Sequence, residues 1–210
     1  MPFEPRRLDD ARTLRALAHP LRIELMDQLT FRGPLTATQC AALVGESPSS
    51  CSFHLRTLAK YGFVEEAEGG TGRQRPWRVV TLGNRWDTTP STPPAQRAAG
   101  ETLSRLVRDR DRELHETYLA RADEFEPDWA SAAVQANFGG YLTPAELQEI
   151  ADKLFQMWMP YMERVEAPPA ERPAGSRLVH MAVYGFPRAD SLDEEPDAAE
   201  DGDSNGDDDA

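Results

Sequence analysis

The fold of this 210-residue chain is decided by residues 47–64, which read SPSSCSFHLRTLAKYGFV. Ser47 has the side chain of a helix N-cap, and Pro48 suits the first helical position because that position needs no N–H donor. Gly62 tolerates the backbone conformation that ends a helix. Three apolar positions at helical spacing face the core: Cys51, Leu55 and Leu58. The stretch therefore predicts a short helix with one buried face and one exposed face.

Three further helices precede this one. Residues 8–17 predict the first, with Asp9 or Asp10 as its cap, and Pro20 opens a second that Gly33-Pro34 stops. Thr36 caps a third, which runs through Leu43. Two strands follow, over residues 63–67 and 77–81, and their Gly-rich connection is too long for a tight turn. Helix, turn, helix and basic hairpin together predict a winged helix-turn-helix.

The exposed face of the 48–61 helix carries the residue types that read DNA. Short polar side chains near the helix N-terminus let the backbone approach the major groove: Ser47, Ser49, Ser50 and Ser52. Arg56 suits a guanine edge or a phosphate, and Phe53 suits a thymine methyl group. The alternative is that the serines are only helix caps and solvated surface.

The segments on either side of this helix add further candidate contacts. Arg73 and Arg75 lie near the tip of the wing, where they suit the minor groove or the DNA backbone. Thr36 and Gln39 lie at the start of the preceding helix, where they suit a phosphate.

Two motifs resemble ArsR-type regulators. Residues 16–22, ALAHPLR, are similar to the opening of that family, and residues 52–64, SFHLRTLAKYGFV, are similar to its recognition helix running into the wing. The resemblance covers about residues 8–83. It implies a homodimeric transcriptional regulator, often a repressor, that binds an imperfect palindrome and in many relatives releases DNA when a metal or small molecule binds.

The chain departs from the metal-sensing members of that family, which carry paired cysteines in the helix before the turn. Here that helix offers only Cys40, and a thiolate metal site needs several ligands. Cys51 lies inward on the next helix, so the two cysteines are either buried apolar residues or a redox pair. The four histidines are not grouped, and the sequence predicts no metal site: His19, His54, His115 and His180.

Charge is distributed unevenly along the chain. The formal net charge of −13 divides into about +3 over residues 1–85, −5 over 86–188 and −11 over 189–210. The N-terminal segment is therefore mildly basic, and the tail is expected to be disordered. No apolar run has the length of a membrane span, and the N-terminus is too polar for a signal peptide, so a cytoplasmic protein is expected.

The C-terminal half begins with a long amphipathic helix predicted over residues 95–124. Its apolar face is a candidate dimerisation surface, the alternative being packing within its own subunit: Leu103, Leu106, Val107, Leu114 and Tyr118. A shorter helix is predicted over 129–138, another from Thr143 that Pro160 ends or kinks, and one strand over 178–186. Aromatic residues in this half form either an effector pocket or an ordinary core: Trp129, Phe138, Tyr141, Phe155, Trp158 and Tyr161.

The predicted architecture is mainly α-helical with a small β-hairpin wing. It comprises a winged helix-turn-helix domain at 1–85, a helical dimerisation or effector domain at 95–187 and an acidic tail at 188–210. The expected function is sequence-specific DNA binding by a dimeric transcriptional repressor, with a small apolar or aromatic effector as a further hypothesis. No catalytic grouping, phosphate loop or metal cluster indicates an enzyme or a cofactor. The alternative is a winged-helix module that contacts proteins and reads no specific DNA.

Overall fold

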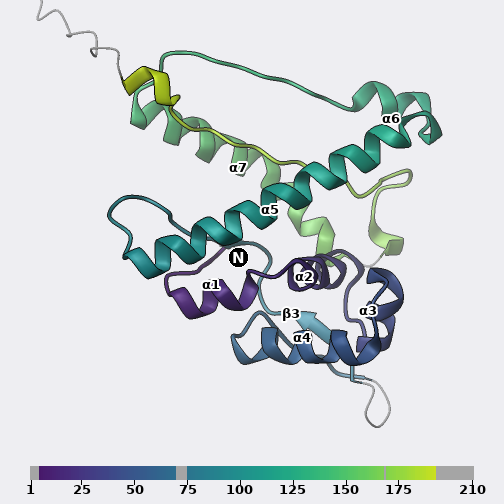
Figure 1. Ribbon diagram of the computed structural model, residues 1–210. Coiled ribbons are helices and arrows are strands. Elements are labelled where there is room, and N and C mark those ends of the chain that lie inside the picture. Colours follow the sequence, from purple (N-terminus) through teal and green to yellow (C-terminus); the bar gives the residue numbers. More distant parts are fainter. Residues whose placement is uncertain (1–4, 70–74, 168, 193–210) are drawn as a thin grey trace, which may run out of the picture.

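Four helices and a hairpin form the N-terminal module of the computed structural model, which describes residues 5–69, 75–167 and 169–192 (Figure 1). The helices are α1 (Ala11–Leu17), α2 (Pro20–Arg32), α3 (Ala37–Val44) and α4 (Pro48–Lys60). The antiparallel hairpin joins β2 (Val64–Glu66) to β3 (Trp77–Val79), and a parallel pair joins β1 (Arg6–Arg7) to β4 (Asn84–Arg85). This is the predicted winged helix-turn-helix layout, with strands shorter than expected.

The predicted helix caps are present. Asp10 accepts hydrogen bonds from the backbone of Arg12 and Thr13, both at 2.9 Å. Thr36 and Gln39 form a reciprocal capping box at the start of α3, and Gly45 ends that helix at a φ of +70°.

The prediction that the first helix begins at residue 8 was wrong. Leu8 is buried ahead of α1, and its N–H donates to the carbonyl of Arg85 at 2.8 Å.

The core of the module lies between the helices and the hairpin. Cys51, Leu55 and Leu58 of α4 are fully buried, as their spacing predicted. Leu14 of α1, Leu25 and Leu29 of α2, and Phe63 and Val64 of the wing complete its centre.

Helix α5 (Pro94–Ala120) connects the two halves of the chain. Its first three turns pack against α1 and α2, and Ala99 and Leu103 are buried in the N-terminal core. Trp86 in the preceding linker donates its indole N–H to Ser104 at 2.9 Å. The later turns of α5 leave the module and lie among the C-terminal segments (Figure 1).

The C-terminal half differs from expectation in three places. The helix predicted over 129–138 is α6 (Pro127–Ala132), and residues 133–142 are extended. Helix α7 (Pro144–Glu166) is capped by Thr143 as predicted, but it does not end at Pro160, which was one of the two expected outcomes there. Pro160 is exposed, so water can hydrate the carbonyl that a proline leaves unpaired. The predicted strand over 178–186 is extended but unpaired, because none of the described segments forms a strand beside it. Three short 3₁₀ turns also occur: Ala122–Glu124, Pro169–Glu171 and Ala189–Leu192.

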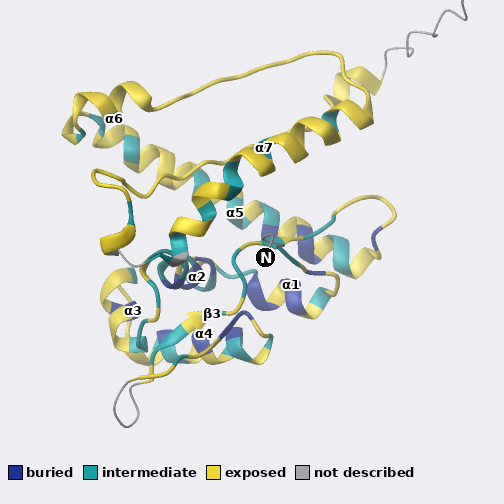
Figure 2. Ribbon diagram, turned by 180° about the vertical axis from the view of Figure 1, so that it is seen from behind, coloured by how far each residue is buried: buried dark blue, intermediate teal, exposed yellow. Residues whose placement is uncertain are grey.

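Burial falls sharply along the chain (Figure 2). Between residues 104 and 192, the structure describes no buried residue, although α7 is strongly amphipathic. Phe138 and Tyr141 are more than 90% exposed. The second half of the chain therefore presents apolar faces that its own fold leaves uncovered. Within the described ranges, no helix is long and apolar enough to cross a membrane.

Candidate nucleic-acid interface

Helix α4 presents a polar and aromatic face on the side opposite its core contacts. Phe53 is 59% exposed, and Arg56 one turn later is also exposed. Arg56 forms no ion pair or hydrogen bond with any residue that the structure describes. An unpaired guanidinium beside an exposed aromatic ring is available to both a phosphate and a base edge.

The serines at the start of α4 differ in their hydrogen bonds and in their exposure to solvent. Ser47 accepts a hydrogen bond from the N–H of Ser50 at 3.1 Å, and its hydroxyl lies 3.0 Å from that of Ser49. Ser47 is therefore occupied as the helix cap, whereas Ser49 is exposed, and Ser50 and Ser52 are half-buried. The capping alternative holds for Ser47, and the other three hydroxyls line the start of the exposed face.

Thr36 and Gln39 lie at the N-terminus of α3. The Gln39 side-chain oxygen accepts from the Thr36 N–H at 2.8 Å, while the Thr36 hydroxyl accepts from the Gln39 N–H at 3.2 Å. These bonds use one acceptor on each side chain. The Gln39 amide nitrogen is a further donor on an exposed residue, at the positive end of a helix dipole.

The wing arginines are paired with carboxylates. Arg75 bonds Glu66 at 2.7 Å, and Arg78 bonds Glu65 at 2.5 Å. Both pairs are solvent-exposed, and such pairs contribute only about 0–1 kcal/mol, so a phosphate can replace the carboxylate. Arg73, the other predicted wing contact, lies outside the described residues.

Two histidines lie behind the exposed face of α4. The His19 and His54 rings are 4.4 Å apart, and His54 packs edge-on against Phe53 at 5.2 Å. His19 caps α2 because its Nδ1 accepts from the Leu21 N–H at 3.2 Å. Burial lowers the pKa of both histidines, and the positive charge of Arg22 lowers each further.

Among the described side chains, no group of three or more His, Cys, Asp or Glu residues has metal-binding geometry.

The two cysteines are free thiols in the core. Cys40 and Cys51 are both fully buried. Burial raises the pKa of Cys40 to about 11 and raises that of Cys51 as well. Both are therefore protonated at neutral pH, which removes the reactive thiolate form.

The predicted dimerisation residues divide into two groups along α5. Leu103 is fully buried in the core of its own chain, and Leu106 and Val107 pack partly against that core. Their burial matches the alternative of packing within the subunit. Leu114 is 38% exposed, and Tyr118 is half-buried against Phe125, with ring centroids 5.6 Å apart. Only the later turns of α5 offer an accessible apolar surface.

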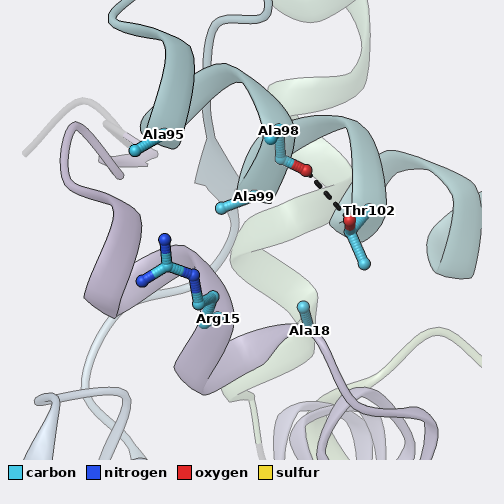
Figure 3. Close-up of a pocket in the computed structure, with 6 residues that line it drawn as sticks. All are labelled: Arg15, Ala18, Ala95, Ala98, Ala99 and Thr102. Carbon is cyan, nitrogen blue, oxygen red and sulfur yellow. Dashed lines mark hydrogen bonds between the residues drawn. The ribbon is translucent and has the colours of Figure 1, made fainter.

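The six aromatic residues predicted as an effector pocket are not brought together. Trp158 and Tyr161 contact each other on α7, with ring centroids 5.8 Å apart, while Phe138 and Tyr141 extend into solvent. Trp129 lies on α6. A shallow hollow occurs elsewhere, between α1 and the start of α5, and Figure 3 shows its lining: Arg15, Ala18, Ala95, Ala98, Ala99 and Thr102.

Sequence reasoning missed one residue that supports α4. Arg6 donates to the carbonyls of Gly62 at 2.7 Å and Tyr61 at 2.9 Å, and its guanidinium lies 4.7 Å from the centre of the Phe63 ring. The side chain thus holds the C-terminal end of α4. No local pattern could have indicated this role, because its hydrogen-bond partners lie 55 and 56 residues along the chain.

Comparison with known proteins bears on the first half of the chain. A solution NMR structure of the homodimeric winged helix-turn-helix DNA-binding domain of a possible ArsR-family transcriptional regulator from Mycobacterium bovis shares 22% identity, with a TM-score of 0.31. The alignment covers 50% of this chain and 82% of that chain. No curated protein matches. The family described as "Helix-turn-helix domain" matches residues 17–67, from the end of α1 through the turn and α4 to the wing. Residues 17–67 of this chain therefore belong to a helix-turn-helix domain.

Proposed function

We propose that this chain is a DNA-binding transcriptional regulator. The observation that carries the proposal is the two-sided character of α4 inside the matched helix-turn-helix. Cys51, Leu55 and Leu58 fix the helix to the core, while Phe53 and Arg56 face solvent on the other side. A helix held in this way can enter the major groove with its N-terminal turns toward the bases.

The contacts divide into two kinds. Arg56 and Phe53, with Ser49, Ser50 and Ser52, read base edges in the major groove. Thr36, Gln39 and the wing arginines contact phosphates. To bind a phosphate, Arg75 breaks its ion pair with Glu66. Neutralised phosphates release counterions, so the affinity falls as the salt concentration rises.

The regulator acts as a homodimeric repressor on an imperfect palindrome. Two recognition helices must lie about 34 Å apart to read successive half-sites, and a dimer fixes that spacing. The accessible later turns of α5, with Leu114 and Tyr118, supply apolar surface for this contact. A small apolar effector acting on the C-terminal half would shift the dimer between DNA-competent and DNA-incompetent forms, provided that it binds the two with different affinities.

The test is selection of bound sequences from random duplex DNA at fixed salt, followed by affinity measurements on the selected site. Arg56→Ala should weaken binding by about 5- to 150-fold, the equivalent of roughly 1–3 kcal/mol, and relax specificity at one position of each half-site. Lys153→Ala is the control, since Lys153 is a 70% exposed cation on α7, outside α4, the wing and the surfaces proposed for dimerisation.

A second candidate function has its own observation. The pairing of Arg75 and Arg78 with glutamates leaves the wing less basic than the sequence suggested, which favours a winged helix that contacts proteins. Two results together would establish that alternative. The selection would enrich no DNA sequence, and the Arg56→Ala and Arg75→Ala variants would bind DNA with the same affinity as the unaltered chain.

A further inference from the structure

The segment of residues 178–186, LVHMAVYGF, is the most unusual part of the C-terminal half; it is called the arm below. It is extended and rich in β-forming residues, yet it belongs to no sheet. Its large apolar side chains are 45–72% exposed: Leu178, Val179, Met181, Val183, Tyr184 and Phe186. Such a segment normally pairs with another strand.

Contacts with two helices position the arm. The Tyr184 hydroxyl donates to Asp111 of α5, and the His180 Nε2 lies 3.1 Å from the same carboxylate. Asp111 is only 12% exposed, so these contacts anchor one face of the arm to α5. Gly185 lies against α7, because a Cβ at that position would be 3.1 Å from a Leu147 methyl carbon. The arm is therefore held in an extended conformation between the two helices.

The edges of the arm are open. Across residues 177–187, the described backbone N–H and C=O groups form no hydrogen bond within the chain. The other extended segment, residues 133–142, forms no backbone hydrogen bond with the arm in the described chain. An anchored strand with unpaired polar groups along its edges is a template for a second strand.

We propose that the arm pairs with the arm of a second copy of this chain, antiparallel about a two-fold axis at Ala182. This inference rests on the dimer of the proposed function and names a contact beyond α5. In this register Leu178 lies opposite Phe186, His180 opposite Tyr184, and Met181 opposite Val183.

The second copy is the occupant that best fits the arm. A symmetric contact requires a self-complementary surface, and the arm has no Asp, Glu, Lys or Arg that would meet its own charge across the axis. Its anchor, Asp111, lies on α5 one turn before Leu114, so the arm continues the surface proposed for dimerisation. Pairing would satisfy the open backbone groups and cover apolar side chains that the single chain leaves in water.

Cysteine cross-linking of the full chain tests the register. In an antiparallel pair, a residue on the axis faces its own copy at a Cα separation of about 4.5–5.5 Å, which a disulfide can span. Ala182→Cys should convert most of the protein to a covalent dimer under mild oxidation. The native cysteines contribute little background because both are buried. Leu142→Cys, on the other extended segment and 51% exposed before substitution, is the control that should remain monomeric on a non-reducing gel.

Proline substitution tests the backbone pairing separately. Neither the Met181 nor the Ala182 N–H has an acceptor within the described chain, so proline at either position should leave the thermal midpoint of the N-terminal module unchanged. Neighbouring N–H groups of a strand point to opposite edges, so one of the two variants removes a donor aimed at the partner. At least one of Met181→Pro and Ala182→Pro should raise the dimer dissociation constant about tenfold or more in sedimentation experiments.

The outcomes separate this inference from the proposed function. Three results would overturn the arm pairing. The protein could dimerise without cross-linking through Ala182→Cys, or Leu142→Cys could cross-link equally well. The third is a dimer dissociation constant that neither proline substitution changes. A chain that is monomeric at all concentrations would overturn it too. Cross-linking of the Ala182→Cys variant, in a protein that selects no DNA sequence, would leave the arm pairing in place and remove the proposed function.

Discussion

At the scale of single residues, the contact between His19 and His54 links the cap of α2 to the recognition helix. Each ring is partly removed from water, and burial lowers the pKa of both histidines below the ordinary value of about 6.5. In the folded chain both are neutral at pH 7, with the His19 Nδ1 free to accept from Leu21. The pair therefore makes the stability of the module depend on pH.

The sign of this dependence follows from the direction of the pKa shifts. Below about pH 6.5 the histidines of the unfolded chain become protonated, whereas those of the folded chain, with their lower pKa, remain neutral. Protons therefore favour the unfolded state, and the free energy of unfolding should fall as the pH is lowered from about 7.5 to about 5.5. Urea unfolding at several pH values measures this. His54→Gln should flatten the curve, because glutamine does not titrate. Glu24, whose pKa burial raises, acts in the opposite direction, so the comparison of the variant with the unaltered chain isolates the histidine.

Residue-scale features were predictable where their chemistry is local. Asp10, Thr36 and Ser47 cap helices within three residues of themselves, and the sequence places such side chains ahead of apolar periodicity. Arg6 and Asp111 were not predictable, because their partners lie far along the chain. The ion pairs of the wing were missed because glutamates opposite the arginines become visible only once the hairpin register is known.

At the scale of elements, the packing of the linker on α5 depends on a glycine in a helix. A Cβ at Gly100 would lie 2.9 Å from the Thr88 methyl group and 3.2 Å from Trp86 Cδ1. The absence of a side chain therefore lets the linker lie directly on the helix. This contact fixes the linker against the first turns of α5.

Gly100→Ala should destabilise the chain by about 1–3 kcal/mol, even though alanine favours a helix, because the added methyl group overpacks the site. Thermal or urea unfolding gives the size of the loss. Adding Thr88→Ser, which removes the clashing methyl group, should recover part of it. Gly139→Ala is the matched control, with no atom within 4 Å of the added Cβ and an expected change within about 0.5 kcal/mol. Equal effects at the two glycines would contradict the packing argument.

Helices were predicted better than strands for a physical reason. A helix satisfies its own backbone, so caps and periodicity locate α2, α3 and α4 closely and place the start of α7 at its Thr143 cap. A strand needs a partner, and nothing in the sequence of residues 178–186 specifies whether a neighbour is present. The helix predicted over 129–138 was too long for a related reason. Apolar residues continue after α6 ends at Ala132, but they are exposed and have no core to pack against.

At the scale of the whole molecule, the two halves differ in how much they bury. The N-terminal module contains every fully buried large side chain in the described part of the chain, up to Leu103. Stability should therefore be concentrated there, with local opening elsewhere. The proposed functions divide in the same way, since the proposed DNA contacts lie on the half that contains the buried core and the proposed partner contacts lie on the other.

Hydrogen exchange measures this asymmetry. Amides of residues 134–142 donate no backbone hydrogen bond in the described structure and should exchange within seconds to minutes, near the rate of an unfolded peptide. Amides in the middle of α4 should be protected to the limit set by global unfolding. Comparable protection in both segments would show that the C-terminal half has a core of its own.

The burial of Ala99 and Leu103 sets an order of events during protein synthesis. The core that holds the recognition helix is closed only when the first turns of α5 join it, and β4 must also be available to pair with β1. A nascent chain stopped at Arg85 would lack that closing helix. The ribosome must therefore release residues beyond Leu103 before the winged helix-turn-helix module can complete its fold. The remaining turns of α5, which carry the accessible apolar surface, emerge immediately afterward.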